Sequence, residues 1–278
     1  MGWLLWLLAF ALGATLGSFA NVVIYRLPLA ESVVTPPSHC FSCGTRLSVL
    51  DLFPVLSYVL LRGRCRHCGQ RFSPRYALVE AACGLLAVGC LVLLGLTWQA
   101  LATFIVCYCL VIIFFIDLDH MIIPDEFVVI IAALGIALDV GELVRRGSLA
   151  AISFSEWVGP TAFTVYLPRS LVGMVVGAGL LLFLSFVFEK AMGKPSMGGG
   201  DVKLAGAMGA VLGPGYHFLS YFLLAVVAGA VIGVGLMALR VRGRRDYIPF
   251  GPMLAASGIA VLLFGDSIVP WVIGRFTL

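Results

Sequence analysis

The stretch WLLWLLAFALGATLGSFANVVIY, residues 3–25, runs for 23 residues without a charged side chain. An α-helix rises about 1.5 Å per residue, so a run of this length covers a hydrocarbon core of roughly 30 Å. A secretory signal peptide would begin with basic residues and have a shorter apolar core, so we expect a retained membrane helix. Of all 278 residues, 61% are hydrophobic and only 12% are charged, which is about half the charged share of soluble domains. The chain is therefore predicted to be a polytopic membrane protein.

Seven further apolar runs predict an all-α protein with about eight transmembrane helices. They cover residues 77–96, 100–116, 127–144, 171–188, 202–213, 218–239 and 250–264. The stretch 201–213 would extend only about 20 Å as a helix, which is too short for a full span. We expect its neighbours to bury it and water to reach its first residues.

The basic residues predict the orientation of these helices. With the amino terminus outside, all but four of the 18 lysines and arginines lie in inner loops, as the positive-inside rule requires. The four exceptions are Arg145, Arg146, Arg169 and Arg275. Eight crossings return the carboxyl terminus to the outside. The net charge of +4 is thus a topology signal and gives no support for nucleic-acid binding.

The one sizeable inner loop, residues 26–75, carries two CxxCG units. These are SHCFSCGTRLS (38–48) and RGRCRHCGQRF (62–72), with the pairs Cys40, Cys43 and Cys65, Cys68. Four thiolates in two such turns are typical of a tetrahedral structural Zn²⁺ site, so we expect a small cytoplasmic zinc-knuckle loop domain. A pair of disulfides is the alternative, but stable disulfides are rare in the reducing cytosol.

Other possible ligands have weaker patterns. The histidines beside the knuckles, His39 and His67, could replace a cysteine. The remaining cysteines lie within apolar runs without ligand spacing, and we interpret them as small buried hydrophobes: Cys83, Cys90, Cys107 and Cys109.

Acidic residues gather at the inner ends of two apolar runs. FFIDLDHMIIPDE (114–126) holds Asp117, Asp119, Asp125 and Glu126, and SMGGGDVKLAGAMG (196–209) holds Asp201. Paired aspartates suit an aspartic protease, in which one carboxylate is the base on a shared water and its protonated partner donates to the substrate carbonyl. Glycines before Asp201 would let the backbone bend and approach a substrate. Alternatively, such acids mark the interface, cap a helix or pair with an arginine.

These motifs together resemble the type IV prepilin peptidase family of GxGD aspartic proteases. The resemblance rests on GSFANVVIYRLP (17–28), both CxxC units, RYALVE (75–80), IDLDHMIIPD (116–125), GGGD (198–201) with Val202 and Lys203 following, and IPFGP (248–252). GxGD alone is weak, because presenilin-type proteases share it.

The resemblance implies a multi-pass enzyme of the bacterial inner membrane with its active site at the cytoplasmic face. It would remove the basic leader of type IV prepilins or type II secretion pseudopilins and then N-methylate the new amino terminus with S-adenosylmethionine. The implied catalytic pair is Asp117 and Asp201. The implied supporting residues are Asp119, Asp125, Gly198, Gly200 and Lys203.

Methylation, by the same resemblance, belongs to the CxxC loop. Because no glycine-rich dinucleotide fold is present, we expect S-adenosylmethionine to bind against this loop and the helix ends near it. Gly63 would allow close approach, and Glu80 is a candidate to hold or deprotonate the amine. Glu80 could equally be a structural partner of Arg75 or Arg26.

The expected organisation is a first transmembrane helix (1–25), a zinc-binding loop domain (26–76) and a transmembrane aspartic peptidase domain (77–278). A transporter with a carboxylate-lined site would usually show paired repeats and polar groups near the midplane, whereas these acids gather at one face. A membrane thiol oxidoreductase would need a CxxC unit on the oxidising side. The sequence does not predict which prepilins are cut or the oligomeric state.

Overall fold

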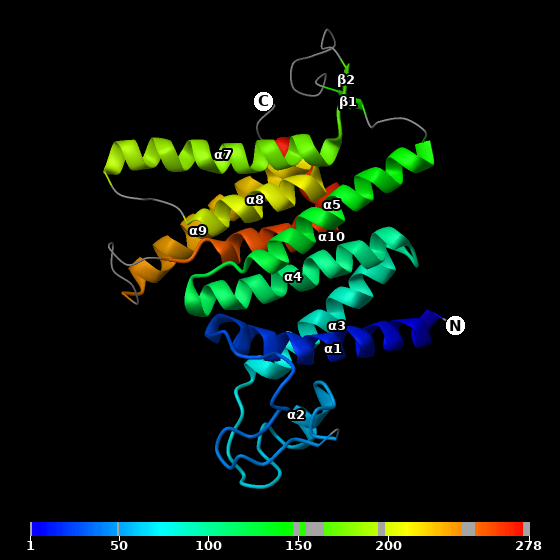
Figure 1. Ribbon diagram of the computed structural model, residues 1–278, viewed down its shortest axis with the longest axis vertical. Helices are drawn as coiled ribbons and strands as arrows, with labels where there is room; N and C mark the ends of the chain where they lie inside the picture. Colours follow the sequence, from blue (N-terminus) through cyan, green and yellow to red (C-terminus); the bar gives the residue numbers. More distant parts are fainter. Residues whose placement is uncertain are drawn as a thin grey trace. The chain divides into compact units, whose positions relative to one another are not determined.

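The computed structural model describes residues 2–48, 50–146, 151–153, 164–193, 198–240 and 248–274. In this part of the chain nearly all regular structure is helical (Figure 1). The chain divides into two compact units, Met1–His120 and Met121–Leu278.

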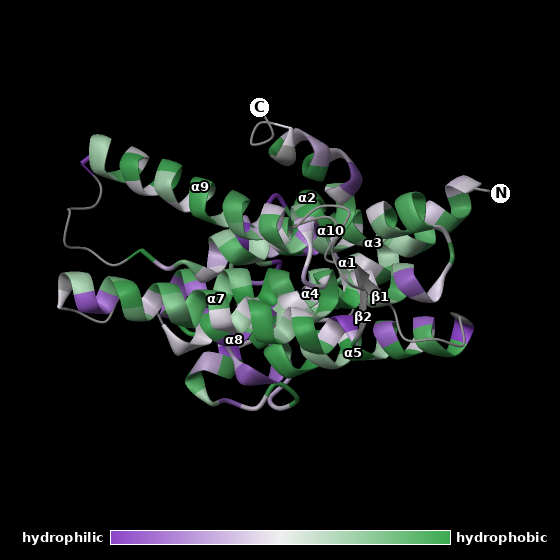
Figure 2. Cartoon of the chain, turned by 90° about the horizontal axis from the view of Figure 1, so that it is seen from above, coloured by the Kyte–Doolittle hydropathy of each residue, from purple (hydrophilic) through white to green (hydrophobic). Residues whose placement is uncertain are grey.

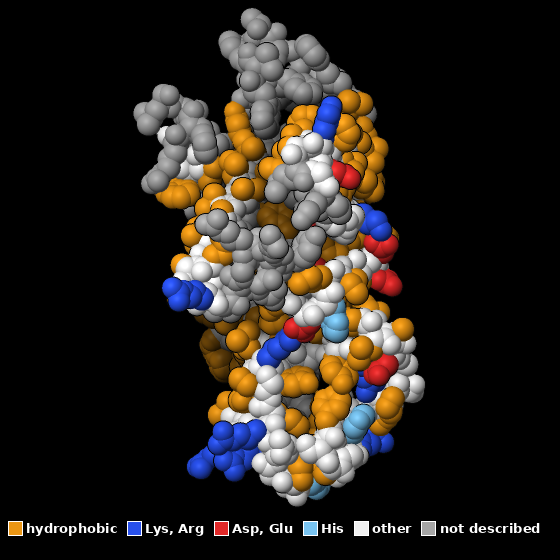
Figure 3. All heavy atoms as spheres, turned by 90° about the vertical axis from the view of Figure 1, so that its left-hand side faces the viewer, with side chains coloured by type: hydrophobic (Ala, Val, Ile, Leu, Met, Phe, Trp, Pro, Cys, Tyr) orange, Lys and Arg blue, Asp and Glu red, His pale blue; other side chains and the backbone are white. Residues whose placement is uncertain are grey.

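The first unit contains three long helices and the cysteine-bearing loop. Its elements are α1 (Gly2–Arg26), the short 3-10 helix η1 (Leu27–Leu29), α2 (Leu56–Leu60), α3 (Arg75–Leu94) and α4 (Trp98–His120). The loop connects η1 to α3 and includes α2 (Figure 1). Figure 3 shows basic side chains on this part of the surface, at the lower end of the view, and the exposed arginines of the loop include Arg46, Arg62, Arg64 and Arg71.

Helices α1 and α3 approach closely because glycines line their interface. A Cβ atom on Gly17 would lie 2.7 Å from the Cα atom of Glu80, and one on Gly84 would lie 2.7 Å from the Phe10 ring. Small residues allow such contact between membrane helices, where dispersion packing drives association. Gly13 belongs to the same interface, since a Cβ there would meet the Ala87 side chain at 2.7 Å.

The second unit is a helical bundle with a small strand pair. Its elements are α5 (Asp125–Arg146), the antiparallel strands β1 (Ala151–Ser153) and β2 (Thr164–Tyr166), α7 (Arg169–Met192), α8 (Gly199–Leu212), α9 (Tyr216–Ala238) and α10 (Gly251–Ile273). Helix α8 lies against α7, α5 and α10, and most of its residues after Lys203 are buried. A helix that is apolar all round needs such cover.

Within the described residues, seven helices are long and apolar enough to cross a membrane: α1, α3, α4, α5, α7, α9 and α10. Figure 2 shows hydrophobic residues along their length. Large apolar side chains such as Phe183 (63% exposed) and Phe186 (65%) point outward, as lipid contact requires and as soluble surfaces avoid. The multi-pass helical membrane fold is thus confirmed. The short sixth run is confirmed as well, because α8 has only 14 residues.

The predicted orientation still rests on the sequence. Four of the inner basic residues lie outside the described part of the chain: Lys194, Arg242, Arg244 and Arg245.

The contact between α7 and α8 gives the first prediction. A Cβ atom on Gly173 would overlap the backbone carbonyl of Gly209, and the reverse also holds. We expect Gly173→Val to destabilise the detergent-solubilised protein by about 3 kcal/mol or more, at the upper end for overpacked cores. Thermal unfolding measures this. Gly179→Ala is the control, because nothing lies within 4 Å of its added Cβ; equal stability of the two variants would contradict the packing argument.

Candidate functional site

The four predicted cysteine ligands come together in the first unit. The Sγ atoms of Cys40, Cys43, Cys65 and Cys68 all lie within 4.8 Å of one another. The two knuckles supply two thiols each, so they close around one point. Four sulfur donors leave no open coordination position, which is the arrangement of a structural metal site.

The two knuckles have the same backbone hydrogen bonds. In the first, the Cys40 N–H donates to the Thr45 carbonyl (2.9 Å) and the Gly44 N–H donates to the Cys40 carbonyl (2.8 Å). In the second, Cys65 and Gly69 repeat this pattern with distances of 2.8 and 3.0 Å. Gly44 and Gly69 have φ angles of +68° and +72°, a conformation that glycine adopts without strain. The glycine of each CxxCG unit is thus required by its turn.

The environment of these thiols favours metal binding. Hydrogen bonds from the side chain and backbone of Thr45 lower the pKa of Cys43 to about 6. Backbone N–H groups of Cys68 and His67 lower the pKa of Cys65. A backbone hydrogen bond from Gln70 lowers the pKa of Cys68, but burial and the neighbouring thiols raise it to about 11. Thiolate is the form that binds a metal, so the hydrogen bonds favour that form at Cys43 and Cys65. The ring of His39 is held elsewhere, with Nδ1 3.2 Å from the Pro37 carbonyl oxygen, and the metal-binding cluster found among the described residues consists of the cysteines alone.

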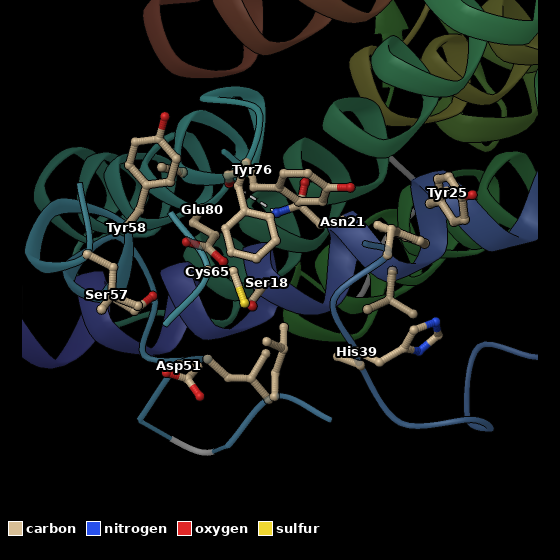
Figure 4. Close-up of a pocket in the computed structure, with 18 of the residues that line it drawn as sticks. Ser18, Asn21, Tyr25, His39, Asp51, Ser57, Tyr58, Cys65, Tyr76 and Glu80 are labelled. Atoms are coloured by element: carbon tan, nitrogen blue, oxygen red, sulfur yellow. Dashed lines mark hydrogen bonds between the residues drawn. The ribbon is translucent and has the colours of Figure 1, made fainter. Parts of the chain in front are cut away.

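A cavity of about 560 Å³ lies beside the second knuckle, within the first unit (Figure 4). The carboxyl-terminal half of α1, the knuckle loop, α2 and the start of α3 form its walls. Both methylation candidates, Gly63 and Glu80, line it, although 17 positions separate them in the sequence. The lining also includes five aromatic residues and two further acids: Tyr25, Phe41, Tyr58, Phe72, Tyr76, Glu31 and Asp51.

Gly63 allows a close approach as expected, but the group that approaches it is the Tyr58 side chain. Its φ angle is +65°, and a Cβ atom there would lie 2.8 Å from both Cζ and Oη of Tyr58. Its N–H donates to the Tyr58 carbonyl at 2.8 Å. Any larger residue at position 63 would displace the Tyr58 ring from the cavity wall.

Glu80 is buried and bonded to the loop. Its Oε2 atom accepts a hydrogen bond from the Val55 N–H at 2.8 Å, and the residue is 9% exposed. The arginines considered as its partners bond elsewhere: Arg75 forms an ion pair with Asp119 (2.7 Å), and Arg26 donates to the Ser32 carbonyl (3.0 Å).

Asp51 fixes the second knuckle from outside. It accepts hydrogen bonds from the Ser48 hydroxyl (2.6 Å) and N–H (3.1 Å) and forms an ion pair with Arg66 (2.9 Å), which lies between the knuckle's two cysteines. The Ser48 hydroxyl, followed by the other donors and the Arg66 charge, lowers the pKa of Asp51. Sequence reasoning missed Asp51, because no motif marks it.

The acids at the end of α4 differ in their surroundings. Asp119 is partly exposed and paired with Arg75, whose guanidinium also lies 4.6 Å from the centre of the Phe115 ring. Asp117 is buried, at 5% exposure. The ion pair therefore gives Asp119 a structural role.

In the second unit, the segment before α5 meets the start of α8. The Lys203 ammonium group donates to both carboxylate oxygens of Asp125, at 2.8 and 2.9 Å. A Cβ on Gly200 would lie 3.0 Å from Cβ of Ile123, so this glycine is needed for the close contact. Gly198 is the N-cap of α8, and Asp201 lies in its first turn, where the helix dipole stabilises a carboxylate.

Asp201 lies well inside the length of α7. The carboxyl end of α8 is level with the start of α7, since Arg169 donates to the Leu212 carbonyl at 2.8 Å. The two helices then run antiparallel, with Gly209 against Gly173 and Ala205 against Gly177. One turn earlier, Asp201 is level with residue 181, and α7 continues to Met192, roughly 16 Å farther. The carboxylate is thus recessed from that end of α7.

Asp117 lies in the first unit and Asp201 in the second. The structure brings together Cys40, Cys43, Cys65 and Cys68 at one point, Gly63 and Glu80 around one cavity, and Lys203 and Asp125 in one ion pair.

Comparison with known proteins identifies the family. Residues 11–94 match the bacterial peptidase A24 N-terminal domain, and residues 104–234 match the type IV leader peptidase family. A prepilin leader peptidase/N-methyltransferase of Aeromonas hydrophila is 34% identical over 300 residues, covering 99% of this chain and 96% of that protein. The chain belongs to the type IV leader peptidase family.

Other relatives agree with this assignment. A protein of the same description from Pseudomonas putida is 36% identical, over 94% of this chain and 91% of its own length. One from Burkholderia pseudomallei (strain K96243) is 35% identical, over 93% and 85%. No solved structure matches the chain. The amino-terminal family domain contains both knuckles and the cavity, and the peptidase family match contains Asp117 and Asp201.

The cysteine cluster gives the second prediction. We expect purified protein to bind about one metal ion per chain, because four thiolates complete one tetrahedral shell. Cys40→Ser or Cys65→Ser should lose the ion, measured by elemental analysis. Cys109→Ala, in which a buried thiol of α4 is replaced, should keep it. Normal metal content in the two serine variants would exclude the site.

Proposed function

We propose that this chain is a prepilin leader peptidase and N-methyltransferase of the bacterial inner membrane. It cleaves type IV prepilins or type II secretion pseudopilins at the cytoplasmic face and then methylates the new amino terminus. Family membership over nearly the full length supports both activities, and it does not favour a transporter or a thiol oxidoreductase. The basic residues of the inner loops support the cytoplasmic face.

The observation that carries the peptidase assignment is the family match of residues 104–234, which contain both aspartate motifs. Asp119 and Asp125 are held in ion pairs with Arg75 and Lys203. Asp117 is buried, and Asp201 starts a recessed helix. We assign Asp117 and Asp201 as the catalytic pair because they lie in the two aspartate motifs that resemble those of the family, one buried and the other recessed.

The proposed mechanism is that of an aspartic protease. In the proposed reaction one carboxylate takes a proton from water as it attacks the scissile carbonyl, and the protonated partner donates to the carbonyl oxygen. Two carboxylates close together share one proton readily, which prepares both roles.

Supporting roles follow from the second unit. The bond from Lys203 to Asp125 joins the first turn of α8 to the first turn of α5. Gly198 and Gly200 keep side chains away from the approach to Asp201 and allow contact with Ile123. The ion pair is largely exposed, so we expect it to contribute no more than about 1 kcal/mol to stability.

The third prediction concerns cleavage. Asp117→Asn and Asp201→Asn keep the shape of the side chain but cannot share a proton across a water, so each should abolish leader removal. Asp125→Asn should lower the rate by about tenfold or less, because a weakened surface ion pair is worth about 1 kcal/mol. Glu126→Gln, at an exposed neighbouring position, is the control and should cleave normally. Cleavage is measured on a synthetic prepilin in detergent, and ready cleavage by Asp201→Asn would refute the pair.

For the cysteine cluster we propose Zn²⁺ in a structural role. Four thiolates suit it by charge and softness, and a closed shell leaves no position for a substrate. The metal would hold residues 38–48 and 62–72 together and so preserve one wall of the cavity.

For the methyltransferase we propose that S-adenosylmethionine binds in the cavity of the first unit. A volume of about 560 Å³ is within the range of cofactor pockets. Aromatic faces attract a sulfonium cation, and the carboxylate of Glu31 and the amide oxygen of Asn21 can accept hydrogen bonds from hydroxyl and amino groups. S-adenosylmethionine supplies an electrophilic methyl group. The chain must bind the new amine beside it and favour its unprotonated form.

The fourth prediction tests this location. S-adenosylmethionine photo-crosslinked to the purified protein should label peptides from residues 18–80, and excess S-adenosylhomocysteine should suppress the label. Tyr58→Ala should raise the dissociation constant by roughly tenfold, since loss of one aromatic contact costs about 1–2 kcal/mol with a desolvated cation. Phe183→Ala, on the outer surface of α7, should leave it unchanged. Labelling confined to residues 121–274 would place the cofactor elsewhere.

A further inference from the structure

The backbone at Val55 has an unusual conformation beside the cavity. Its φ and ψ angles are +61° and −49°, and the Leu56 N–H donates to the Pro54 carbonyl at 2.6 Å. This is a γ-turn with positive φ, which is rare and strained. Valine is β-branched and especially unsuited to it. Such strain persists only where the surroundings enforce it.

The Glu80 carboxylate forms a hydrogen bond with this turn. Its Oε2 atom accepts the N–H of Val55, the central residue of the turn, at 2.8 Å. Glu80 lies in α3, and its Cα atom packs against Gly17 of α1. The carboxylate therefore connects a strained loop to the most closely packed helix pair of the first unit.

The turn determines how α2 begins. Helix α2 starts at Leu56, directly after Val55, and its residues Ser57 and Tyr58 line the cavity. At the other end of α2, the Gly63 N–H donates to the Tyr58 carbonyl, and the Tyr58 ring packs against the position where Gly63 has no side chain. Glu80, through Val55, and Gly63 thus contact the two ends of α2. Figure 4 shows Glu80 and Tyr58 among the residues that line the cavity.

We propose that Glu80 is a positioning residue for methyl transfer. It acts through the Val55 N–H to hold α2, and so keeps the Tyr58 ring at the cavity wall as the aromatic contact for S-adenosylmethionine. This inference rests on the cofactor site proposed above. It also separates Glu80 from proton transfer, because its role is to accept a main-chain hydrogen bond.

Two substitutions distinguish this role from that of a base. Glu80→Gln keeps an oxygen that accepts the Val55 N–H but cannot take a proton from an amine, whereas Glu80→Ala removes both functions. We expect Glu80→Gln to change the KM for S-adenosylmethionine by less than about threefold. Glu80→Ala should raise it by about tenfold or more, the size expected when a hydrogen bond to a charged group is lost, with a smaller change in kcat. Methyl transfer is measured on a peptide that already has a free amino terminus.

A compensating change tests the path through Val55. Glycine adopts positive φ without strain, so Val55→Gly in the Glu80→Ala background should restore most of the affinity. Amide hydrogen exchange without any cofactor supplies a separate measurement: residues 55–63 should exchange faster in Glu80→Ala and return toward wild type in the double variant. Metal content and leader cleavage show that each variant is folded, and neither should change.

The outcomes separate the two proposals. A large fall in kcat for Glu80→Gln with unchanged KM would make Glu80 a base and overturn its positioning role. Absence of rescue by Val55→Gly would also overturn it. If exchange at residues 55–63 rises in Glu80→Ala while the affinity for S-adenosylmethionine stays constant, the link from α2 to the cofactor is wrong. Absence of cofactor labelling at residues 18–80 in the wild type would instead refute the proposed site itself.

Discussion

The contact between Gly173 and Gly209 is the constraint on which the second unit depends. Neither position has room for a methyl group, because each would overlap the carbonyl of the other. A helix of 14 residues is too short to cross the hydrocarbon core by itself. Neighbouring helices must therefore cover α8. The glycines allow α7 to provide that cover, and α5 and α10 complete it. Because the carboxyl end of α8 is fixed by Arg169, its short length leaves Asp201 recessed. Because α8 begins only at Gly199, the Asp201 carboxylate in its first turn lies within the bundle.

Glycines also allow close helix packing in the first unit, where they fix the position of Glu80. Glycines at positions 13, 17 and 84 bring α1 against α3, and this packing fixes the backbone from which Glu80 extends. The loop then depends on two anchors of different chemistry. The cysteine cluster closes the knuckles, and Glu80 holds the strained turn at Val55. The cavity lies between these anchors, so its shape depends on both.

The sequence predicted the features that follow from local rules. Uncharged runs of about 20 residues predict spanning helices, and CxxCG spacing predicts knuckles with glycine at positive φ, as found at Gly44 and Gly69. It could not predict which acids form ion pairs. The partners Asp125 and Lys203 are 78 positions apart, and Arg75 is 44 positions from Asp119. The sequence could not predict the hydrogen bond from the Val55 N–H to Glu80 either, since valine is among the residues least expected at positive φ. Such contacts arise from tertiary packing and leave no periodic pattern.

The chemistry of the two proposed reactions fixes their order without any further device. An amide nitrogen is not basic, so the nitrogen that becomes the new amino terminus is not nucleophilic until the scissile peptide bond is cut. Cleavage therefore creates the substrate for methylation, and methylation cannot precede it. The two sets of residues can then be altered separately: substitution of Asp201 should leave methyl transfer to a peptide with a free amine, whereas substitution of Tyr58 should leave cleavage. This independence agrees with the separate family matches of residues 11–94 and 104–234. The activity of each site therefore depends on the arrangement of its own residues and not on that of the other site.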